Sequence, residues 1–216
     1  MKIVAIQGSP SASSRSGSLM ALAHSRLKGV ASSSHPIVVR DLPAQALLHA
    51  QFDHPLIHRA LTDVASAQVV LIATPIYKAA YSGVLKAFLD LLPQDGLRGK
   101  TVLPLATGGS IAHLLALDYA LKPVLSALGA RDILDPVLAT DAQIPRHETL
   151  GYAPLPEVVG RVESALQVLI DRAEDFERSE EAARERDELL ARLQPKPASP
   201  IVHPEPWPAR DVRWSV

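Results

Sequence analysis

The stretch KIVAIQGSPSASSRSGS, residues 2–18, combines a short apolar run, a serine-rich loop and the start of an amphipathic segment. The apolar run, residues 3–6, is typical of a central parallel strand whose sheet is covered by helices on both faces. The loop that follows turns at Gly8 and carries Arg15 as its only charge. Serine hydroxyls, turn amides and a helix N-terminus can all donate hydrogen bonds to an anion, and an arginine can bind two phosphate oxygens at once. The stretch therefore predicts a binding loop for a phosphorylated small molecule.

Spacing separates this loop from two common nucleotide-binding loops. The next glycine after Gly8 is Gly17, so the G-x-G-x-x-G pattern of dinucleotide-binding folds does not fit. No lysine lies between Lys2 and Lys28, so the P-loop pattern does not fit either. Serines in place of glycines suit a single terminal monophosphate better than a pyrophosphate that must contact bare backbone. A serine-rich turn that only caps a helix is the alternative that the loop alone leaves open.

Composition narrows the class of protein. The chain has 216 residues, 47% of them hydrophobic, which is enough for one α/β domain and an appendage. Lys and Arg number 22 against 23 Asp and Glu, so the strong positive field of a nucleic-acid-binding protein is missing. The absence of cysteine excludes disulfides, thiol redox chemistry and thiolate metal sites. Without a leader-like segment or an apolar run of membrane length, we expect a cytoplasmic protein that binds neither nucleic acid nor a membrane.

Apolar runs alternate with amphipathic stretches along the chain, which predicts a flavodoxin-like α/β fold with a five-stranded parallel sheet and helices on both faces. The expected strands are residues 3–6, 36–39, 69–73, 101–106 and 133–139, and the expected helices are residues 18–28, 56–67, 84–92, 112–128 and a last one from about 158.

Two prolines predict local irregularity. Pro104 cannot donate a hydrogen bond within its expected strand, so we expect irregular pairing there. Pro123 lies inside the expected helix at 112–128 and removes a bond that the carbonyl of Tyr119 would accept. A kink or π-bulge near Tyr119 is therefore predicted.

The chain changes character near residue 175. Residues 177–192 are a run of mixed charge, which predicts an exposed continuation of the last helix. Residues 194–208 are rich in proline and are expected to be extended or disordered. We therefore expect a domain at 1–175, followed by a charged helix extension and a flexible tail at 176–216. Trp207 and Trp214 lie in that tail, so docking on a partner or on the protein's own dimer is an alternative, although the composition favours a flexible tail.

One pair of histidines has metal-ligand spacing. His54 and His58 are four residues apart, which on a helix places both on one face. No third ligand is near in the sequence, so we favour surface histidines and predict no metal site.

Three loops follow expected strands and so meet at the carboxyl edge of the sheet, where ligands bind in open α/β folds. They are residues 9–18, 75–81 and 107–113. The second loop brings two tyrosines and Lys78 to this edge. In the third, the Thr-Gly-Gly turn at 107–109 lets backbone approach a flat ligand closely.

Several motifs at these positions resemble those of the NADPH-dependent FMN reductases: GSP at 8–10, SRSGSL at 14–19, ATPIYKAAYSG at 73–83 and LPLATGG at 103–109. The run AHLLALDYALKPVL at 112–125 is similar to the reductase of the two-component alkanesulfonate monooxygenase system. The resemblance implies a flavodoxin-like fold, reduction of FMN by NADPH or NADH, and delivery of reduced FMN to an FMN-dependent monooxygenase that cleaves organosulfonates for sulfur. It also implies a homodimer or homotetramer with the π-bulge at an interface.

The resemblance also implies roles for individual residues. The FMN phosphate would be held by Ser9, Ser14, Arg15, Ser16 and Ser18, and the isoalloxazine would be lined by Pro75, Ile76, Tyr77, Lys78, Thr107, Gly108, Gly109 and His113. Tyr81 and Tyr119 are expected at an oligomer interface, with ordinary packing as the alternative. Many family members have an arginine where this chain has Ser11, so Arg15 must serve instead.

The expected chemistry requires no catalytic side chain, because a hydride passes from the nicotinamide directly to the flavin. Backbone amides and Lys78 are candidates to stabilise the reduced flavin. A reductase of quinones, azo dyes or metal oxyanions that keeps FMN bound is a second hypothesis. A flavodoxin-like electron carrier is a third, but carriers tend to be strongly acidic and this chain has a net charge of -1.

Overall fold

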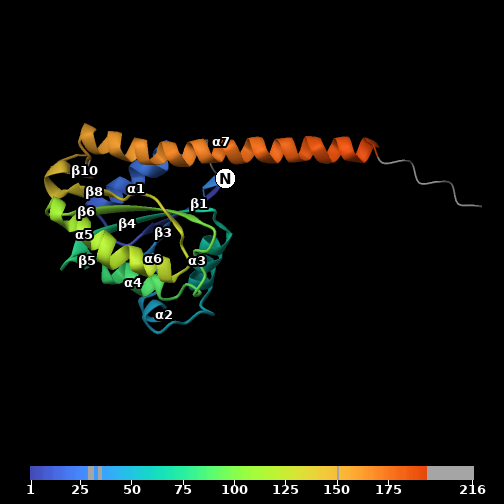
Figure 1. The fold of residues 1–216 in the computed structure, drawn as a ribbon. Coiled ribbons are helices and arrows are strands. Elements are labelled where there is room, and N and C mark those ends of the chain that lie inside the picture. The colour runs from blue at the N-terminus through green and yellow to red at the C-terminus, as the bar shows by residue number, and fades with distance from the viewer. Residues whose placement is uncertain (29–31, 34–35, 150, 194–216) are drawn as a thin grey trace, which may run out of the picture. The chain divides into compact units, whose positions relative to one another are not determined.

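The first of two compact units contains an α/β/α sandwich (Figure 1). The structure is a computed structural model that describes residues 1–28, 32–33, 36–149 and 151–193, and the units are residues 1–175 and 176–216. In the described part of the chain, the main sheet has the order β2, β1, β4, β6, β7. Its parallel segments are β1 (Lys2–Gln7), β2 (Ser32–Ser33), β3 (Ile37–Val38), β4 (Val69–Tyr77), β6 (Thr101–Gly108), β7 (Asp132–Ile133) and β8 (Val137–Thr140). The predicted flavodoxin-like parallel sheet is confirmed.

The number of strand segments differs from the predicted five because both outer positions of the sheet are divided. Among the described residues, β2 and β3 both pair with β1, and β7 and β8 both pair with β6. On the β7–β8 side, the break faces Leu103 and Pro104, between the pairs that begin at Thr101 and at Leu105. Proline has no N–H to donate to a neighbouring strand, which explains the break. Pairing with β4 continues through Pro104, so the predicted irregularity is confirmed on one side of β6.

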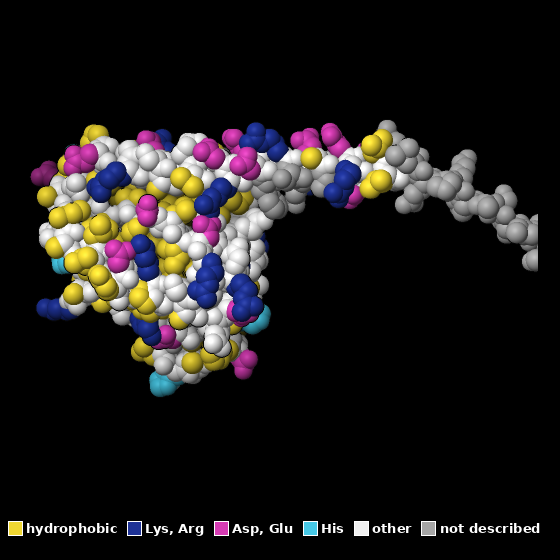
Figure 2. Space-filling model, viewed as in Figure 1, with side chains coloured by type: hydrophobic (Ala, Val, Ile, Leu, Met, Phe, Trp, Pro, Cys, Tyr) yellow, Lys and Arg dark blue, Asp and Glu magenta, His cyan; other side chains and the backbone are white. Residues whose placement is uncertain are grey.

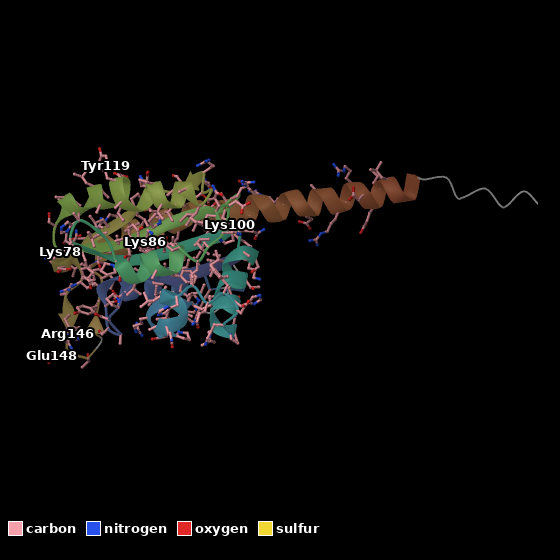
Figure 3. The ribbon with its side chains drawn as sticks, turned by 90° about the horizontal axis from the view of Figure 1, so that it is seen from below. Lys78, Lys86, Lys100, Tyr119, Arg146 and Glu148 are labelled. Atoms are coloured by element: carbon pink, nitrogen blue, oxygen red, sulfur yellow. The ribbon has the colours of Figure 1, made fainter. Side chains whose placement is uncertain are left out.

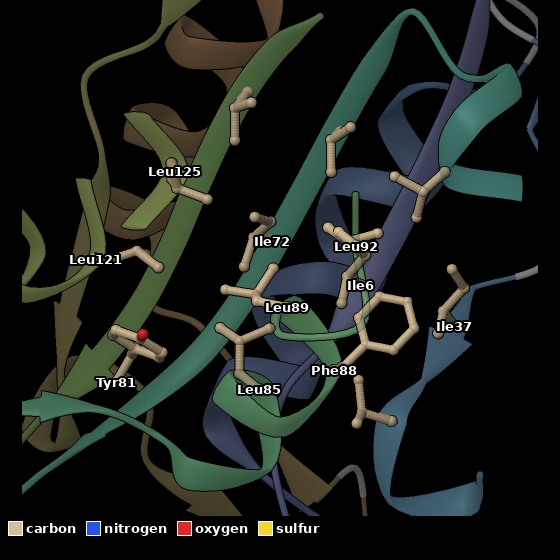
Figure 4. Close-up of a cluster of buried hydrophobic side chains, with 14 of the residues drawn as sticks. Ile6, Ile37, Ile72, Tyr81, Leu85, Phe88, Leu89, Leu92, Leu121 and Leu125 are labelled. Carbon is tan, nitrogen blue, oxygen red and sulfur yellow. The ribbon is translucent and has the colours of Figure 1, made fainter. Parts of the chain in front are cut away.

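Side chains alternate between the two faces of the sheet, as the pleat of a strand requires. On β1, Val4 and Ile6 enter one buried cluster while Ile3 and Ala5 enter the other. The first face is covered by α2 (Ala44–Leu48), α3 (Pro55–Ser66), α4 (Gly83–Leu89) and α6 (Lys122–Ala127). The second face is covered by α1 (Arg15–Arg26) and the start of α7 (Pro156–Leu193). Figure 4 shows α4 packing Leu85, Phe88 and Leu89 onto the first face.

The segment at 111–127 is a chain of short helices and not the single helix expected. It consists of the 3₁₀ turn η2 (Ile111–His113), α5 (Leu114–Ala116), the π-helical turn η3 (Leu117–Leu121) and α6. The backbone N–H of Lys122 bonds to the carbonyl of Leu117, five residues earlier. The π-bulge predicted near Tyr119 is therefore confirmed, and Pro123 explains it, because proline removes the next donor of the helix.

Helix α7 is long, and its buried face ends before residue 175. Val158, Val162, Leu166 and Leu169 are buried in the first unit. In the second unit, Leu189 and Leu190 are exposed. The proline-rich stretch at 194–216, with Trp207 and Trp214, lies outside the described residues. A search of the described helices finds none with the length and apolar character to cross a membrane.

A polar cluster ties α7 to the amino ends of β6 and β7. Arg172 of α7 pairs with Asp132, whose carboxylate also accepts a hydrogen bond of 2.6 Å from the Thr101 hydroxyl. Burial alone would raise the pKa of Asp132, but the bonds from Thr101 and Arg172, together with the charge of Arg172, lower it overall.

Candidate functional site

A hollow of about 280 Å³ lies at the carboxyl edge of the sheet, where the three loops meet. The residues around it come from the loop at 9–18, named the phosphate loop after its predicted ligand, from the ends of β4 and β6, and from the segment after β8. They are Ser11, Ser13, Ser14, Arg15, Ser16, Pro75, Ile76, Tyr77, Thr107, Gly108, Gly109, Asp141 and Tyr152. Nine of the predicted site residues are therefore together in one place: Ser14, Arg15, Ser16, Pro75, Ile76, Tyr77, Thr107, Gly108 and Gly109.

The phosphate loop ends in a capped helix whose first turn faces the hollow. The Ser14 hydroxyl accepts a bond of 3.0 Å from the Gly17 N–H, which explains why α1 begins at Arg15 and not near the expected residue 18. The Ser16 hydroxyl is buried, and no partner for it is found among the described residues. Buried polar groups are normally hydrogen-bonded, so this oxygen is one to which a ligand can bond.

The side chains of two serines, Ser9 and Ser18, form hydrogen bonds with backbone groups of the protein. The Ser9 hydroxyl is buried and accepts a bond of 3.2 Å from the N–H of Ser11. The Ser18 hydroxyl donates a bond of 2.7 Å to the carbonyl of Arg15. Neither residue lines the hollow, and their bonds shape the loop and the first turn of α1.

Arg15 is held from three sides. Its Nε donates a bond of 3.0 Å to the carbonyl of Ile144, and its guanidinium lies 4.7 Å from the centre of the Tyr152 ring. One terminal nitrogen lies 3.5 Å from a carboxylate oxygen of Asp141. These contacts connect the phosphate loop to the segment that follows β8.

The end of β4 forms a hairpin with β5 (Ala80–Tyr81) that carries Tyr77 and Lys78. Lys78 and Ala79 both have positive φ, 51° and 60°, the backbone conformation of a type I′ turn, which normally selects Asn and Gly. Two non-glycine residues in this conformation store strain of the kind found at functional sites. Tyr77 is half exposed at the hollow, whereas Lys78 does not line it. Figure 3 shows Lys78 at the same end of the domain as Arg146 and Glu148.

A buried bond network joins the hairpin to the phosphate loop. The Ser82 hydroxyl donates to the carbonyl of Gly8 and accepts a bond of 3.1 Å from the N–H of Leu85. The Thr74 hydroxyl accepts a bond of 3.1 Å from the N–H of Ser82. The strand end of β1, the strand end of β4 and the start of α4 are thus fixed to one another.

The third loop is shaped by contact between a glycine and a histidine. A Cβ at Gly108 would lie 2.7 Å from Nδ1 of His113, so only glycine fits under this ring. Nδ1 is buried and has no partner among the described residues. His113 does not line the hollow, and its ring lies against the turn at 108–109.

The sequence did not point to Ser11, Ser13, Asp141 or Tyr152, which also line the hollow. Asp141 directly follows β8. Ligands bind at the carboxyl ends of the strands in open α/β sheets, and applying this rule to the last strand of the sheet would have selected Asp141. Tyr152 belongs to β10 (Gly151–Tyr152), which pairs with β9 (Arg146–His147). No sequence motif predicted this pair of strands.

The two tyrosines expected at an interface differ in exposure. Tyr81 packs in the core beside Leu85 and Leu121 (Figure 4), and burial, followed by the charge of Asp90, raises its pKa. Tyr119 is 80% exposed and points away from the domain in Figure 3. Ile111, Leu114 and Leu115 are exposed on the same helical segment, and Figure 2 shows hydrophobic side chains gathered near α5. Tyr119 therefore remains the stronger interface candidate of the two.

Two further features lie apart from this site. A larger hollow of about 480 Å³ lies between α3 and the segment after α4, away from the carboxyl edge of the sheet, and none of the predicted site residues lines it. His54, one of the paired histidines, caps α3 by accepting a bond of 3.3 Å from the N–H of Leu56.

Comparison with known proteins agrees with this geometry. Residues 1–144 match the family NADPH-dependent FMN reductase. The chain is 43% identical to an FMN reductase (NADPH) of Pseudomonas putida over the whole of both chains. It is also 43% identical to an FMN reductase (NADPH) of Escherichia coli, covering 79% of this chain and 87% of that one.

Solved structures give the same result. The apo form of an NADH:FMN oxidoreductase, EmoB, superposes with a TM-score of 0.69 at 40% identity, covering 80% of this chain and 87% of that one. A flavodoxin of Streptococcus pneumoniae, at a TM-score of 0.55 and 13% identity, shares the fold. The matched family, the full-length relatives and the strand-end site together establish that the chain is an NAD(P)H:FMN oxidoreductase belonging to the NADPH-dependent FMN reductase family.

Proposed function

We propose that the protein reduces FMN as an exchangeable substrate and supplies it to an FMN-dependent monooxygenase, with alkanesulfonate desulfonation as the process served. The observation that carries the site assignment is the Ser16 hydroxyl, which is buried at the N-terminus of α1 beside Arg15 and has no partner in the described part of the chain. A hydroxyl, a helix N-terminus and a guanidinium form a donor set for a phosphate. The residues present therefore fit the phosphate end of FMN.

The phosphate loop and the two other loops have separate tasks in this proposal. Ser14, Arg15 and Ser16 hold the phosphate, and the turn at Gly108 and Gly109 gives a flat ring access to backbone N–H groups. Tyr77 and Ile76 line the same hollow. FMN bound here supplies the ring that accepts a hydride from the nicotinamide. The protein's contribution is to orient two flat rings and to offer backbone donors to the reduced ring.

The link to sulfonates rests on the likeness of residues 112–125 to the reductase of the alkanesulfonate system. The exposed apolar residues around Tyr119 offer a surface for a homodimer or homotetramer, or for the monooxygenase.

The test is NADPH oxidation by flavin-free protein as FMN is titrated from zero to excess, with riboflavin as the matched control. We expect a rate that saturates with free FMN and needs no other acceptor. Uptake of one equivalent of FMN, followed by turnover only with a quinone or azo dye, would favour the bound-cofactor reductase. Adding a purified alkanesulfonate monooxygenase and measuring sulfite release tests the partner, and reduced FMN that gives no sulfite would refute that part.

A further inference from the structure

We propose that Asp141 opposes the phosphate at Arg15 and so keeps FMN exchangeable, an inference that rests on the proposed phosphate site. Asp141 is the first residue of η4 (Asp141–Gln143), directly after β8. It lines the same hollow as Ser14, Arg15 and Ser16. An anionic side chain is thus part of the wall of a predicted anion site.

Asp141 and a bound phosphate would compete for the same guanidinium. The carboxylate oxygen lies 3.5 Å from a terminal nitrogen of Arg15, and the Asp141 side chain is 52% exposed. Charge-assisted N–H···O bonds are normally about 2.7–2.9 Å long, so this is a loose pair. The phosphate of FMN would have to share or displace it.

Arg15 keeps its position without Asp141. Its Nε is bonded to the carbonyl of Ile144 at 3.0 Å, and its guanidinium lies over the Tyr152 ring. The η4 turn likewise forms without the carboxylate, because the Gln143 side chain accepts a bond of 2.9 Å from the N–H of Thr140. Asp141 therefore contributes charge and not structure.

The sign of the effect follows from electrostatics. A phosphate dianion that enters the hollow is attracted by Arg15 and repelled by Asp141. Two unit charges 4 Å apart interact by an amount that corresponds to about a fivefold change in affinity in water, and more where water is excluded. Most affinity differences of this kind appear in the dissociation rate. A reductase that must release its product gains from such a group.

The experiment compares FMN and riboflavin binding to flavin-free wild type and Asp141→Asn, by flavin fluorescence and stopped-flow dissociation. We expect FMN to bind about fivefold more tightly to Asp141→Asn and to dissociate correspondingly more slowly. Riboflavin, which lacks the phosphate, should bind equally to both. Salt should shrink the FMN difference, because it screens partly exposed charges. Asp141→Ser provides a second variant if the asparagine protein folds poorly.

Asp95→Asn is the matched control, because Asp95 pairs with Arg98 at 3.8 Å on an exposed turn and does not line the hollow. It changes the net charge equally and should leave FMN affinity unchanged. If Asp95→Asn increased FMN affinity as much as Asp141→Asn does, the effect would come from the net charge of the protein, and the proposal would be overturned. Unchanged or weaker FMN binding in Asp141→Asn would also overturn it, the latter by showing that Asp141 holds Arg15 for the phosphate. Wild type that binds no FMN would refute the phosphate site itself, and wild type that binds FMN but turns over only with a quinone or azo dye would refute only the proposed function.

Discussion

Gly8→Ala tests whether the phosphate loop and α4 are in direct contact. Gly8 directly follows β1, its N–H donates a bond of 2.8 Å to the carbonyl of Ala73, and its carbonyl accepts a bond from the Ser82 hydroxyl. A Cβ added here would lie 2.6 Å from the Cβ of Leu85, which is fully buried on α4. Because the Cβ of Leu85 is fixed to its own backbone, a rotamer change cannot relieve the clash. Helix α4 must shift away from β1.

The cost has two parts. Overpacking a core costs about 1–3 kcal/mol. A shift of α4 also weakens the buried bond from Ser82 to Gly8, which is worth about 1–3 kcal/mol if it is lost. We expect a loss of about 2–6 kcal/mol, which for a domain of this size lowers Tm by about 4–24 °C. FMN affinity should fall as well, because the loop that follows Gly8 moves.

The assay is thermal unfolding followed by circular dichroism, with Gly83→Ala as the control. Gly83 is the first residue of α4, and a Cβ there meets nothing within 4 Å. Alanine at a helical position is favoured over glycine by about 0.5–1 kcal/mol, so this control should be neutral or slightly stabilising. If Gly8→Ala unfolds within 2 °C of wild type (roughly 1 kcal/mol or less), the contact with Leu85 yields easily and the reasoning fails.

Arg15→Ala should weaken FMN binding about tenfold or more, because a bond from a charged group is worth about 1.5–3 kcal/mol, while riboflavin binding stays unchanged; equal loss for both flavins in a fluorescence titration would remove Arg15 from the phosphate site. Tyr119→Ala should alter the oligomeric state or the flavin content, measured by gel filtration and absorbance, and wild-type values for both would refute the interface. Asp132 has a lowered pKa, so its stabilising contribution is present above its unfolded pKa of about 3.9 and is lost as the pH falls through its folded pKa. Asp132→Asn should therefore destabilise the protein at neutral pH and lose less stability than wild type on acidification, and parallel urea midpoints for the two proteins across this range would contradict that linkage.

The parts of the fold that follow from local chemistry were predictable. The buried strands are short apolar runs, and one missing N–H, at Pro104 or Pro123, explains each irregularity. The boundary of α1 was wrong by three residues because the Ser14 cap draws the helix start toward the loop. The second outer segment, β2, was missed. Its residues, Ser32 and Ser33, are polar, and the strands were predicted from runs of apolar residues.

The candidate site was predictable only where its residues follow a strand. Nine expected residues meet because parallel strands deliver their carboxyl ends to one edge. The hydroxyls of Ser9 and Ser18 form hydrogen bonds with backbone groups of the protein. These bonds depend on the side-chain rotamers, which a sequence motif does not specify. Tyr152 reaches Arg15 through a hairpin remote in sequence, and such a contact is a property of tertiary packing.

The buried bonds among Thr74, Ser82 and Gly8 have a consequence for which flavins the protein can accept. They fix the strand end that leads to the phosphate loop relative to the strand end that leads to Tyr77. The fold therefore sets the distance between the two ends of the hollow, and this distance does not change with the ligand. With FMN bound as proposed, a molecule whose ring and phosphate are joined by a longer or shorter chain would reach the binding groups at one end only. Linker length, as much as ring or phosphate chemistry, becomes a criterion of selection.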